Sequence, residues 1–468
     1  MSLQFITGNS GNGKTKYLFN RIVKEAKANP RDNYLVIVPE QFTMQTQRQL
    51  VDLSENKAIM NIDVLSFKRL AYRVFDELGI TNLTVLEETG KNLVLRKLAA
   101  QEADKLGVIG RNLNRIGYIS EVKSLLSELV QYNISPEELG RYIASGRLSD
   151  TLSDKLKDVL VLYEAFEKFM KDKYITAEEI LNVLSNVAEE SAILRNSVIA
   201  FDEFTGFTPI QNQLIKKLFV ISKKIYVTLT IDCREDIFKS RGMQELFDMP
   251  KRTVKSLTEM AAFYGIEVEE PIILDKNYRL AENEELSFME QQLFRKRRCS
   301  FEKAPKHIHI DCLRDPKQEL TKIARRINEL VRNENLRYRD IAIVTGDVNI
   351  YAGYVREIFD KYNIPYFIDA TQEILFHPFI EFIRSIPDIA AQNFSADAVF
   401  RFLRCGFSEL LGSEIDVLEN YVLACGVRGK SAWDKKWVRL PKHKAGYDLE
   451  LLNQSREYIM EMLKPVYQ

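Results

Sequence analysis

Gly8-Asn-Ser-Gly-Asn-Gly-Lys14-Thr15 is the stretch that decides the expected fold. It follows an apolar run at residues 3–6 and precedes a helical pattern at residues 17–26. In such a strand–loop–helix setting, glycines let backbone N–H groups surround a phosphate, and the helix N-terminus favours its negative charge. The stretch therefore predicts a P-loop that binds ATP through Gly8, Asn9, Ser10, Gly11, Asn12, Gly13, Lys14 and Thr15.

Two acids at the end of a later strand complete the expected nucleotide site. Val198-Ile-Ala-Phe-Asp202-Glu203 reads as an apolar strand that ends in two carboxylates. In a P-loop protein Lys14 would reach the β- and γ-phosphates, while Thr15 and Asp202 would hold Mg²⁺. Glu203 fits the catalytic base that activates water if ATP is hydrolysed. Because apolar strands often end in acids, an incidental pair remains the alternative.

The composition of the 468 residues argues against several classes of protein. Lys and Arg total 66, as do Asp and Glu, so only local patches can attract nucleic acid. The five cysteines form no C-x-x-C pair and follow no signal peptide, which indicates reduced thiols in a cytoplasmic protein. The four histidines have no metal-ligand spacing and no run of 18 apolar residues exists, so we expect neither a zinc hydrolase nor a membrane protein.

Strand and helix patterns alternate in two parts of the first 290 residues. Expected strands lie at residues 34–38, 62–65, 197–201 and 224–231, and expected helices at residues 41–51, 67–78 and 209–219. From residue 87 to 192 the chain shows only leucines at helical spacing. We therefore expect an α/β domain with a parallel sheet at residues 1–80 and 193–290, interrupted by an α-helical insertion at residues 81–192.

The later part of the chain predicts another α/β unit. Residues 276–305 are charged and poor in apolar side chains, which is typical of a linker. Expected strands follow at residues 307–312, 341–345 and 366–368, with helices at residues 316–331 and 350–362. We expect the first part of a second α/β domain at residues 300–375 and a helical segment at residues 376–468, in a chain truncated before the second sheet is complete.

The acidic strand end resembles a helicase motif. Asp202-Glu-Phe-Thr-Gly-Phe-Thr-Pro-Ile-Gln211 is similar to motif II of UvrD-like superfamily 1 helicases. It departs from that motif at Thr205 and Gly206, where the family has Gln-Asp. The resemblance implies a P-loop NTPase with a RecA-like parallel sheet, and it makes residues 300–375 the start of a second RecA-like domain.

The motifs that couple ATP to movement look degenerate. Residues 232–242 resemble motif III, but Glu235 and Ser240 replace its coupling glutamine and its DNA-stacking tryptophan. Residues 341–347 resemble the motif IV strand without the arginine that reaches the nucleotide, and too few residues precede Gly8 for a Q-motif that grips adenine. A P-loop retained among such motifs resembles the AddB subunits of bacterial AddAB (RexAB-type) helicase–nucleases.

Specific stretches carry this second resemblance along the whole chain. They are Phe5-Ile-Thr-Gly-Asn-Ser-Gly-Asn-Gly-Lys-Thr15, Val38-Pro-Glu-Gln-Phe-Thr43, Val64-Leu-Ser-Phe-Lys-Arg-Leu-Ala-Tyr-Arg73, Tyr362-Asn-Ile-Pro-Tyr-Phe-Ile-Asp369 and His377-Pro-Phe-Ile-Glu-Phe-Ile-Arg384. The resemblance implies a cytoplasmic subunit that binds ATP, Mg²⁺, single- and double-stranded DNA and an AddA-like partner during double-strand break repair and recombination. It also implies a nuclease domain with a 4Fe–4S cluster, outside these residues.

The same resemblance implies that single-stranded DNA crosses the carboxyl ends of the strands and that Chi is read there. Aromatic rings can stack on bases, and Arg and amide groups can read base edges. The candidate DNA contacts are Gln41, Thr43, Phe67, Arg69, Tyr72 and Phe207. Burial in a helix core is the alternative for Phe67 and Tyr72. The Arg295–Arg298 run is either a phosphate contact or a solvated linker.

Three functional hypotheses follow. The leading one is an ATP- and DNA-binding subunit of a heterodimeric ATP-dependent helicase/deoxyribonuclease, with weak or no ATPase activity of its own. The second is an autonomous superfamily 1 helicase motor, which Glu203 permits and the missing Q-motif and motif IV arginine disfavour. The third is a scaffold whose P-loop is vestigial.

Overall fold

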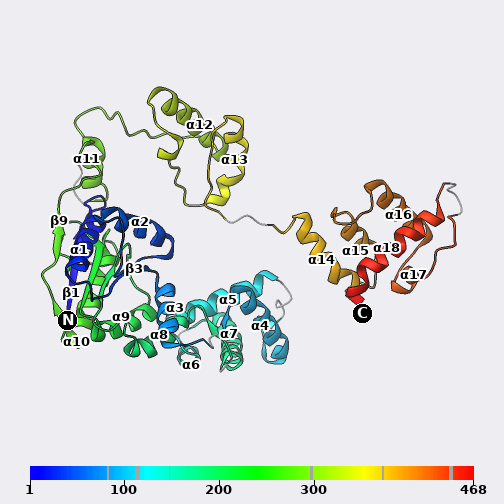
Figure 1. Cartoon of the computed structure of the whole chain (residues 1–468), viewed down its shortest axis with the longest axis horizontal. Helices are drawn as coiled ribbons and strands as arrows, with labels where there is room; N and C mark the ends of the chain where they lie inside the picture. Colours follow the sequence, from blue (N-terminus) through cyan, green and yellow to red (C-terminus); the bar gives the residue numbers. More distant parts are fainter. Residues whose placement is uncertain are drawn as a thin grey trace. The chain divides into compact units, whose positions relative to one another are not determined.

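The structure is a computed structural model that describes residues 1–81, 84–110, 116–146, 148–171, 173–295, 299–370, 374–441 and 446–467 (Figure 1). The chain forms two compact units, Met1–His309 and Ile310–Gln468. No helix in these ranges combines the length and the apolar character that a membrane crossing requires.

A parallel β-sheet organises the first unit. Its strands are β1 (Ser2–Gly8), β2 (Tyr34–Ile37), β3 (Ile62–Leu65), β6 (Val198–Phe201), β7 (Lys224–Thr230), β8 (Glu267–Val268) and β9 (Ile272–Leu274). They lie in the order β3-β2-β6-β7-β1-β8, and β9 also pairs with β1. Since β7 lies between β1 and β6, the loops that follow β1 and β6 meet at one edge of the sheet.

Helices cover both faces of this sheet, which explains the apolar runs in its strands. On one face, α1 (Lys14–Ala28) and α2 (Thr43–Leu53) pack through residues such as Phe19 and Leu50 against Ile6 and Val36. The other face carries α3 (Phe67–Leu78), α8 (Ile180–Val187), α9 (Pro209–Ile221) and α10 (Asp248–Phe263). The predicted strands and helices of this sheet are confirmed to within a few residues, and the mixed α/β architecture is consistent with the predicted RecA-like fold.

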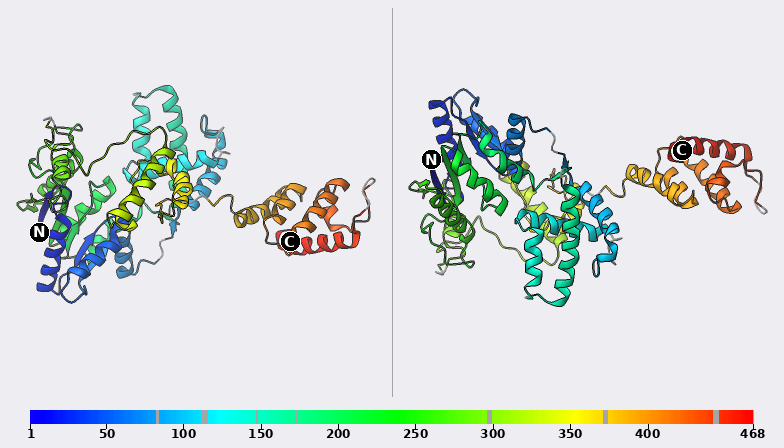
Figure 2. Two further views of the ribbon diagram at one scale, coloured as in Figure 1. Left: turned by 90° about the horizontal axis from the view of Figure 1, so that it is seen from above. Right: turned by 90° about the horizontal axis from the view of Figure 1, so that it is seen from below.

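A helical region with its own core lies beside the sheet between α3 and α8 (Figure 2). It contains α4 (Glu88–Gln101), α5 (Ile116–Gln131), α6 (Pro136–Ala144) and α7 (Asp150–Met170), with the 3₁₀ helix η2 (Ala103–Lys105). The short strands β4 (Val85–Leu86) and β5 (Ile175–Thr176) pair with each other in parallel. The 3₁₀ helices η1 (Glu40–Phe42) and η4 (Ala188–Glu190) flank neighbouring helices. The proposed domain boundaries at residues 81 and 192 remain predictions.

The second unit is helical in the described residues. The amphipathic helices α12 (Pro316–Asn333) and α13 (Val348–Lys361) pack on each other, with η5 (Tyr338–Asp340) between them. A separate core joins α14 (Pro378–Ala391), α15 (Ala396–Leu403), α16 (Gly412–Cys425), α17 (Lys430–Asp434) and α18 (Leu449–Tyr467) around Trp433.

The strands predicted at residues 307–312, 341–345 and 366–368 are wrong, because the described chain is irregular there. Each segment has an apolar side chain that is open to solvent: Ile310 is 93%, Val344 94% and Phe367 89% exposed. A strand is stable only when a neighbouring strand satisfies its backbone groups and its apolar side chains are covered. These segments have apolar composition without such partners, so the second RecA-like domain remains a prediction.

The predicted linker at residues 276–305 is wrong for its first half. After β9 the chain turns back over the loop that follows β1 and forms α11 (Glu284–Gln292). Polar side chains of residues 277–290 form hydrogen bonds with the loop after β1. A low content of apolar residues does not reveal such contacts.

Candidate functional site

The glycine-rich loop, residues 8–15, leaves the carboxyl end of β1 and enters α1. Gly13 caps α1 with φ 79°, and Gly11 has φ 91°, so both adopt backbone conformations that favour glycine. A Cβ atom on Gly11 would lie 2.6 Å from Asn277 Oδ1. The first turn of α1 has N–H groups without helical acceptors, which makes this end of the helix suited to an anion.

The two acids predicted from the sequence lie beside this loop. Thr15 Oγ1 is 3.3 Å from Asp202 Oδ1 and 3.3 Å from Glu203 Oε1. Thr228 on β7, between β1 and β6, donates a further hydrogen bond to Asp202. Sheet order explains this meeting of residues that are 187 positions apart in the chain.

Asp202 is 1% exposed, and burial together with the neighbouring Glu203 raises the pKa of its carboxyl group. Its Oδ2 atom has no hydrogen-bond partner among the described residues. A buried carboxylate oxygen without a donor, next to a threonine hydroxyl, fits the oxygen ligands that Mg²⁺ prefers. Thr15 and Asp202 are thus placed to hold a magnesium ion.

Lys14, the first residue of α1, reaches back to the glycine-rich loop. Its Nζ donates to the backbone oxygen of Asn9 at 3.0 Å. Burial lowers the pKa of Lys14, against the raising effect of Glu203 and Asp202, and Arg279 lowers it further. The side chain therefore sits in a partly desolvated pocket where an anionic ligand would favour its charged form.

Glu203 adopts a left-handed backbone conformation with φ 64°. A non-glycine residue in that region is uncommon, and such strain often occurs at functional sites. The turn places its carboxylate beside Thr15, where it faces the loop.

Sequence reasoning missed a segment that crosses the loop, residues 274–290, here called the strap. Asn277 Nδ2 donates to Ser10 O at 2.9 Å, and the Tyr278 N–H donates to Gly11 O at 3.0 Å. Asn12 Nδ2 donates to Leu274 O at 2.5 Å. The signal in the sequence was the polar and aromatic triplet Asn277-Tyr278-Arg279, which comes two residues after the short apolar run at residues 271–274.

The strap also brings a second cation to the loop. Arg279 lines the same pocket as Lys14, and its Nη1 atom is 3.5 Å from Ser10 Oγ. The expectation of a missing arginine rested on residues 345–347, which follow one of the strands that did not form. An arginine does reach this pocket, from a different part of the chain.

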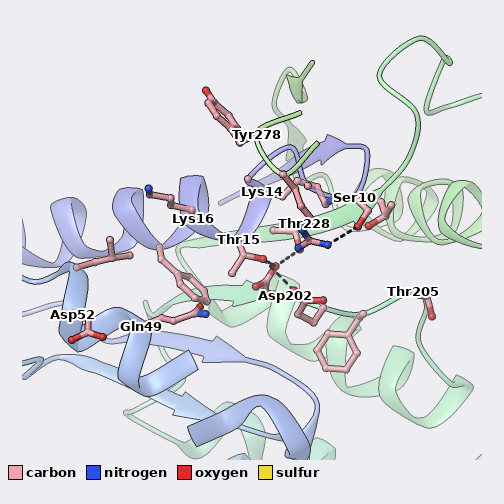
Figure 3. A pocket seen from close by; sticks show the side chains of 18 residues that line it. Ser10, Lys14, Thr15, Lys16, Gln49, Asp52, Asp202, Thr205, Thr228 and Tyr278 are labelled. Atoms are coloured by element: carbon pink, nitrogen blue, oxygen red, sulfur yellow. Dashed lines mark hydrogen bonds between the residues drawn. The ribbon is translucent and has the colours of Figure 1, made fainter. Parts of the chain in front are cut away.

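These groups surround one pocket of about 720 Å³ (Figure 3). Its size lies within the range of small-molecule sites. The glycine-rich loop, α1, α2, the end of β6, β7 and the strap all contribute to its wall. The polar and charged lining residues are Ser10, Lys14, Thr15, Lys16, Gln49, Asp52, Asp202, Glu203, Thr205, Thr228, Thr230, Tyr278 and Arg279.

Two asparagines of the loop, Asn9 and Asn12, brace it against its surroundings. Asn9 is buried; its Nδ2 donates to Glu290 Oε1 at 2.5 Å and its Oδ1 accepts the Cys233 N–H at 3.0 Å. Asn9 and Asn12 therefore hold the loop in place through hydrogen bonds to other segments and do not line the pocket.

The candidate DNA contacts fall into an exposed and a buried group. Gln41 and Arg69 are exposed, and Arg69 Nε donates to Glu40 Oε1 at 2.8 Å. Thr43 is buried and donates to the backbone oxygen of Glu40 at 2.9 Å, so its hydroxyl is engaged in the loop. Tyr72 is partly exposed on the outer side of α3.

Phe67 and Phe207 belong to an aromatic cluster with Phe201 and Phe204. The ring of Phe67 lies 5.8 Å from that of Phe201, 5.5 Å from Phe204 and 6.3 Å from Phe207. Phe67 is only 7% exposed, which fits the core alternative. Phe207 is half-buried and packs against the same core.

Of the basic run, only Arg295 lies in the described residues. It is paired with the buried Asp232 and with Glu235, where Nη1 and Oε1 are 2.9 Å apart. Arg295 thus joins the end of α11 to the loop after β7, and residues 296–298 lie outside the described residues. In the described ranges no group of three or more His, Cys, Asp or Glu side chains is arranged to hold a metal ion.

Comparison with known proteins identifies the family. The model of the family described as "ADDB, N-terminal" matches residues 5–290. The B-type subunit of the ATP-dependent helicase/deoxyribonuclease of Lachnoclostridium phytofermentans is 38% identical over all of this chain, and the proteins of the same name from Clostridium tetani and Clostridioides difficile are 34% and 33% identical over all of it. The chain spans 41%, 40% and 41% of their respective lengths. The match over more than half of its residues shows that the chain belongs to the ADDB N-terminal family.

Proposed function

We propose that this chain is the ATP-binding and DNA-binding N-terminal part of an ATP-dependent helicase/deoxyribonuclease subunit. The observation that carries the proposal is the meeting of Lys14, Thr15 and Asp202 in one pocket (Figure 3). Lys14 and Thr15 begin α1 and Asp202 follows β6, and the three residue types are those that hold a triphosphate and its magnesium ion.

Different groups of the chain bind different parts of the nucleotide. The N–H groups of residues 11–15 surround the phosphates, and the Lys14 ammonium and the Arg279 guanidinium neutralise their charge. Thr15 and Asp202 would hold Mg²⁺, which would supply further positive charge to the phosphates when bound. Tyr278 supplies an aromatic surface at the wall of the pocket.

Nucleotide binding tests this assignment. Lys14→Ala removes the cation that faces the phosphates, so we expect at least a tenfold loss of ATP affinity in titration calorimetry with Mg²⁺ present. Lys24→Ala on the exposed side of α1 is the matched control and should bind normally. Equal ATP affinity of all three proteins would contradict the P-loop assignment, and failure of the wild type to bind would favour a vestigial site.

The autonomous motor remains a second candidate because two observations favour hydrolysis. Glu203 lies beside Thr15 and would serve as the base that activates water, and Arg279 supplies a cation of the kind that stabilises transferring phosphate. A competent ATPase should turn over ATP in the presence of single-stranded DNA and lose at least tenfold in kcat in both Glu203→Gln and Arg279→Ala. Binding without turnover would support the non-motor subunit.

The DNA surface is proposed at the loops after β2 and β3. Gln41, Arg69 and Tyr72 are exposed there, whereas Thr43, Phe67 and Phe207 would act by supporting the loop conformation. Arg69→Ala should weaken binding of a single-stranded oligonucleotide, or its preference for a Chi sequence, and should cost no more stability than the loss of its exposed ion pair with Glu40, about 1 kcal/mol. The exposed Arg48→Ala on α2 serves as the control for general loss of charge.

The names of the relatives support the wider setting. Because each name denotes one subunit of a larger enzyme, we propose an AddA-like partner, a heterodimer, and a role in double-strand break repair and homologous recombination in the cytoplasm. The relatives are about two and a half times as long as this chain, so the nuclease domain with its 4Fe–4S cluster is proposed for the length that the chain does not cover. The second RecA-like domain at residues 300–375 and the helical segment at residues 376–468 belong to the same proposal.

A further inference from the structure

The helical region between α3 and α8 carries an aromatic pair that has no part in the nucleotide pocket. Phe169 in the last turn of α7 and Tyr174 just before β5 stack with their ring centroids 6.0 Å apart and an angle of 6° between the ring planes. Phe169 packs inward on the core of this region, while Tyr174 is 36% exposed. The outer face of the pair can therefore accept another flat ring.

Two lysines lie close to the Phe169 ring of this pair. Lys97 Nζ, from α4, lies 5.9 Å from the centre of the Phe169 ring, and Lys173 Nζ lies 5.8 Å from it. These cations come from elements that are distant in the chain but pack side by side (Figure 1). The structure thus places two positive charges beside the aromatic pair.

The cations around this pair have no acidic partner among the residues that the structure describes. Neither lysine takes part in a salt bridge or a side-chain hydrogen bond within the described residues, and the same holds for the exposed neighbours Lys168 and Lys171. By contrast, other lysines of the region, such as Lys91 and Lys123, pair with glutamates. The unpaired charges are therefore available to a ligand.

The glutamates that precede Phe169 on α7 lie on other faces of that helix. Glu164 and Glu167 on α7 are offset from Phe169 by roughly 140° and 160° around the helix axis, at 100° per residue. Burial is the largest cause that raises the pKa of Glu167, and the charges of Glu137, Glu179 and Glu164 raise it further. Asp172 lies outside the described residues.

We propose that Lys97, Phe169, Lys173 and Tyr174 form a binding site for single-stranded nucleic acid, separate from the loops after β2 and β3. A base stacks on the outer face of Tyr174, and the two lysines bind the flanking phosphates. Stacking needs a base freed from a duplex, and the combination of ring and cations is the one that proteins use to hold single strands without reading sequence. This site deepens the proposed DNA-binding function and rests on it.

Fluorescence anisotropy with a labelled oligo-dT, using the whole chain, tests the site. For the double variant Lys97→Gln/Lys173→Gln we expect weaker binding and a slope of log affinity against log salt that is smaller by about 1.4, since each phosphate contact on a single strand contributes ~0.7. Tyr174→Leu should weaken binding at least about fivefold without changing that slope, and Tyr174→Phe should restore it.

Controls separate this site from the other proposed DNA contacts. Lys155→Gln removes an exposed lysine about 21 Å away along the same helix and should leave binding and slope unchanged. If Arg69→Ala weakens binding while the lysine and tyrosine variants bind as wild type, this site is wrong and the proposed function stands. If wild type does not bind the oligonucleotide, the DNA-binding function itself fails. Equal losses for duplex and single strand in Tyr174→Leu would contradict base stacking.

Discussion

At the scale of single residues, Gly11 shows how little space separates the glycine-rich loop from the strap. Its φ of 91° and the 2.6 Å approach of a Cβ atom to Asn277 Oδ1 both exclude a side chain. Gly11→Ala should lower stability by about 1–3 kcal/mol and weaken ATP binding, because the loop must shift. Thermal unfolding and calorimetric titration would measure the two effects.

The control for this prediction is Gly79→Ala at the end of α3. Gly79 also has positive φ, but a Cβ atom there would meet no atom within 4 Å. The Gly79→Ala variant should be less stable than wild type and should bind ATP with unchanged affinity. Unchanged ATP affinity in Gly11→Ala would show that the contact between loop and strap is not needed for binding.

Glu40 carries a second prediction at this scale. The Ser66 hydroxyl and the Arg69 guanidinium hold the pKa of the Glu40 carboxyl group below its usual range. A depressed pKa in the folded protein means that the stabilisation is present above the usual glutamate pKa and is lost as the pH falls through the folded value. Since more than half of the Glu40 and Arg69 side chains is exposed, their ion pair contributes at most about 1 kcal/mol to the free energy of unfolding.

Glu40→Gln should therefore melt slightly below wild type at pH 7, and the difference should shrink as the pH approaches 4. The measurement is thermal unfolding across that pH range at low salt. A difference that grows on acidification would contradict the assigned direction of the pKa shift.

At the scale of elements, the strap connects β9 to the loop that follows β1. Asn277 donates to Ser10 O, and its Oδ1 accepts the N–H groups of Arg279 and Leu280. One side chain thus holds both the loop and the turn that presents Arg279. Asn277→Ala should weaken ATP binding about three- to tenfold, since a hydrogen bond of this kind contributes ~1 kcal/mol.

Asn283→Ala is the matched control, because Asn283 caps α11 in the strap without touching the glycine-rich loop. It should cost stability and leave ATP affinity near that of wild type. Similar losses of affinity in both variants would mean that general loosening of the strap matters, and not the contact of Asn277 with the loop.

At the scale of the whole molecule, the two units differ in whether the backbone of their apolar segments pairs with a neighbouring strand. The β1, β6 and β7 backbones are paired on both sides, whereas residues 341–345 have no neighbouring strand in the described structure. In hydrogen–deuterium exchange of this chain, we expect amides of the central strands to be strongly protected and those of residues 341–345 to exchange rapidly. Strong protection at residues 341–345 would restore the predicted second sheet.

The sequence by itself determined β1, β2, β3, β6 and β7 of the first sheet and the strand ends that carry Lys14 and Asp202, whereas β8 and β9 were not predicted. The strand–loop–helix pattern around Gly8 and Lys14 depends on local propensity, and the apolar run before Asp202 is long enough to identify a buried strand. Phe67 was harder, because periodicity does not distinguish an aromatic on the core side of a helix from one that binds a ligand.

Tertiary structure alone decided which distant groups meet. Strand order brings Asp202 to Thr15, and the return of the chain after β9 brings Arg279 to Lys14. It also left the apolar residues 341–345 unpaired, where the sequence predicted a strand. The physical reason is that strand pairing and side-chain contacts between remote segments depend on what lies alongside in space, which neither composition nor spacing along the chain contains.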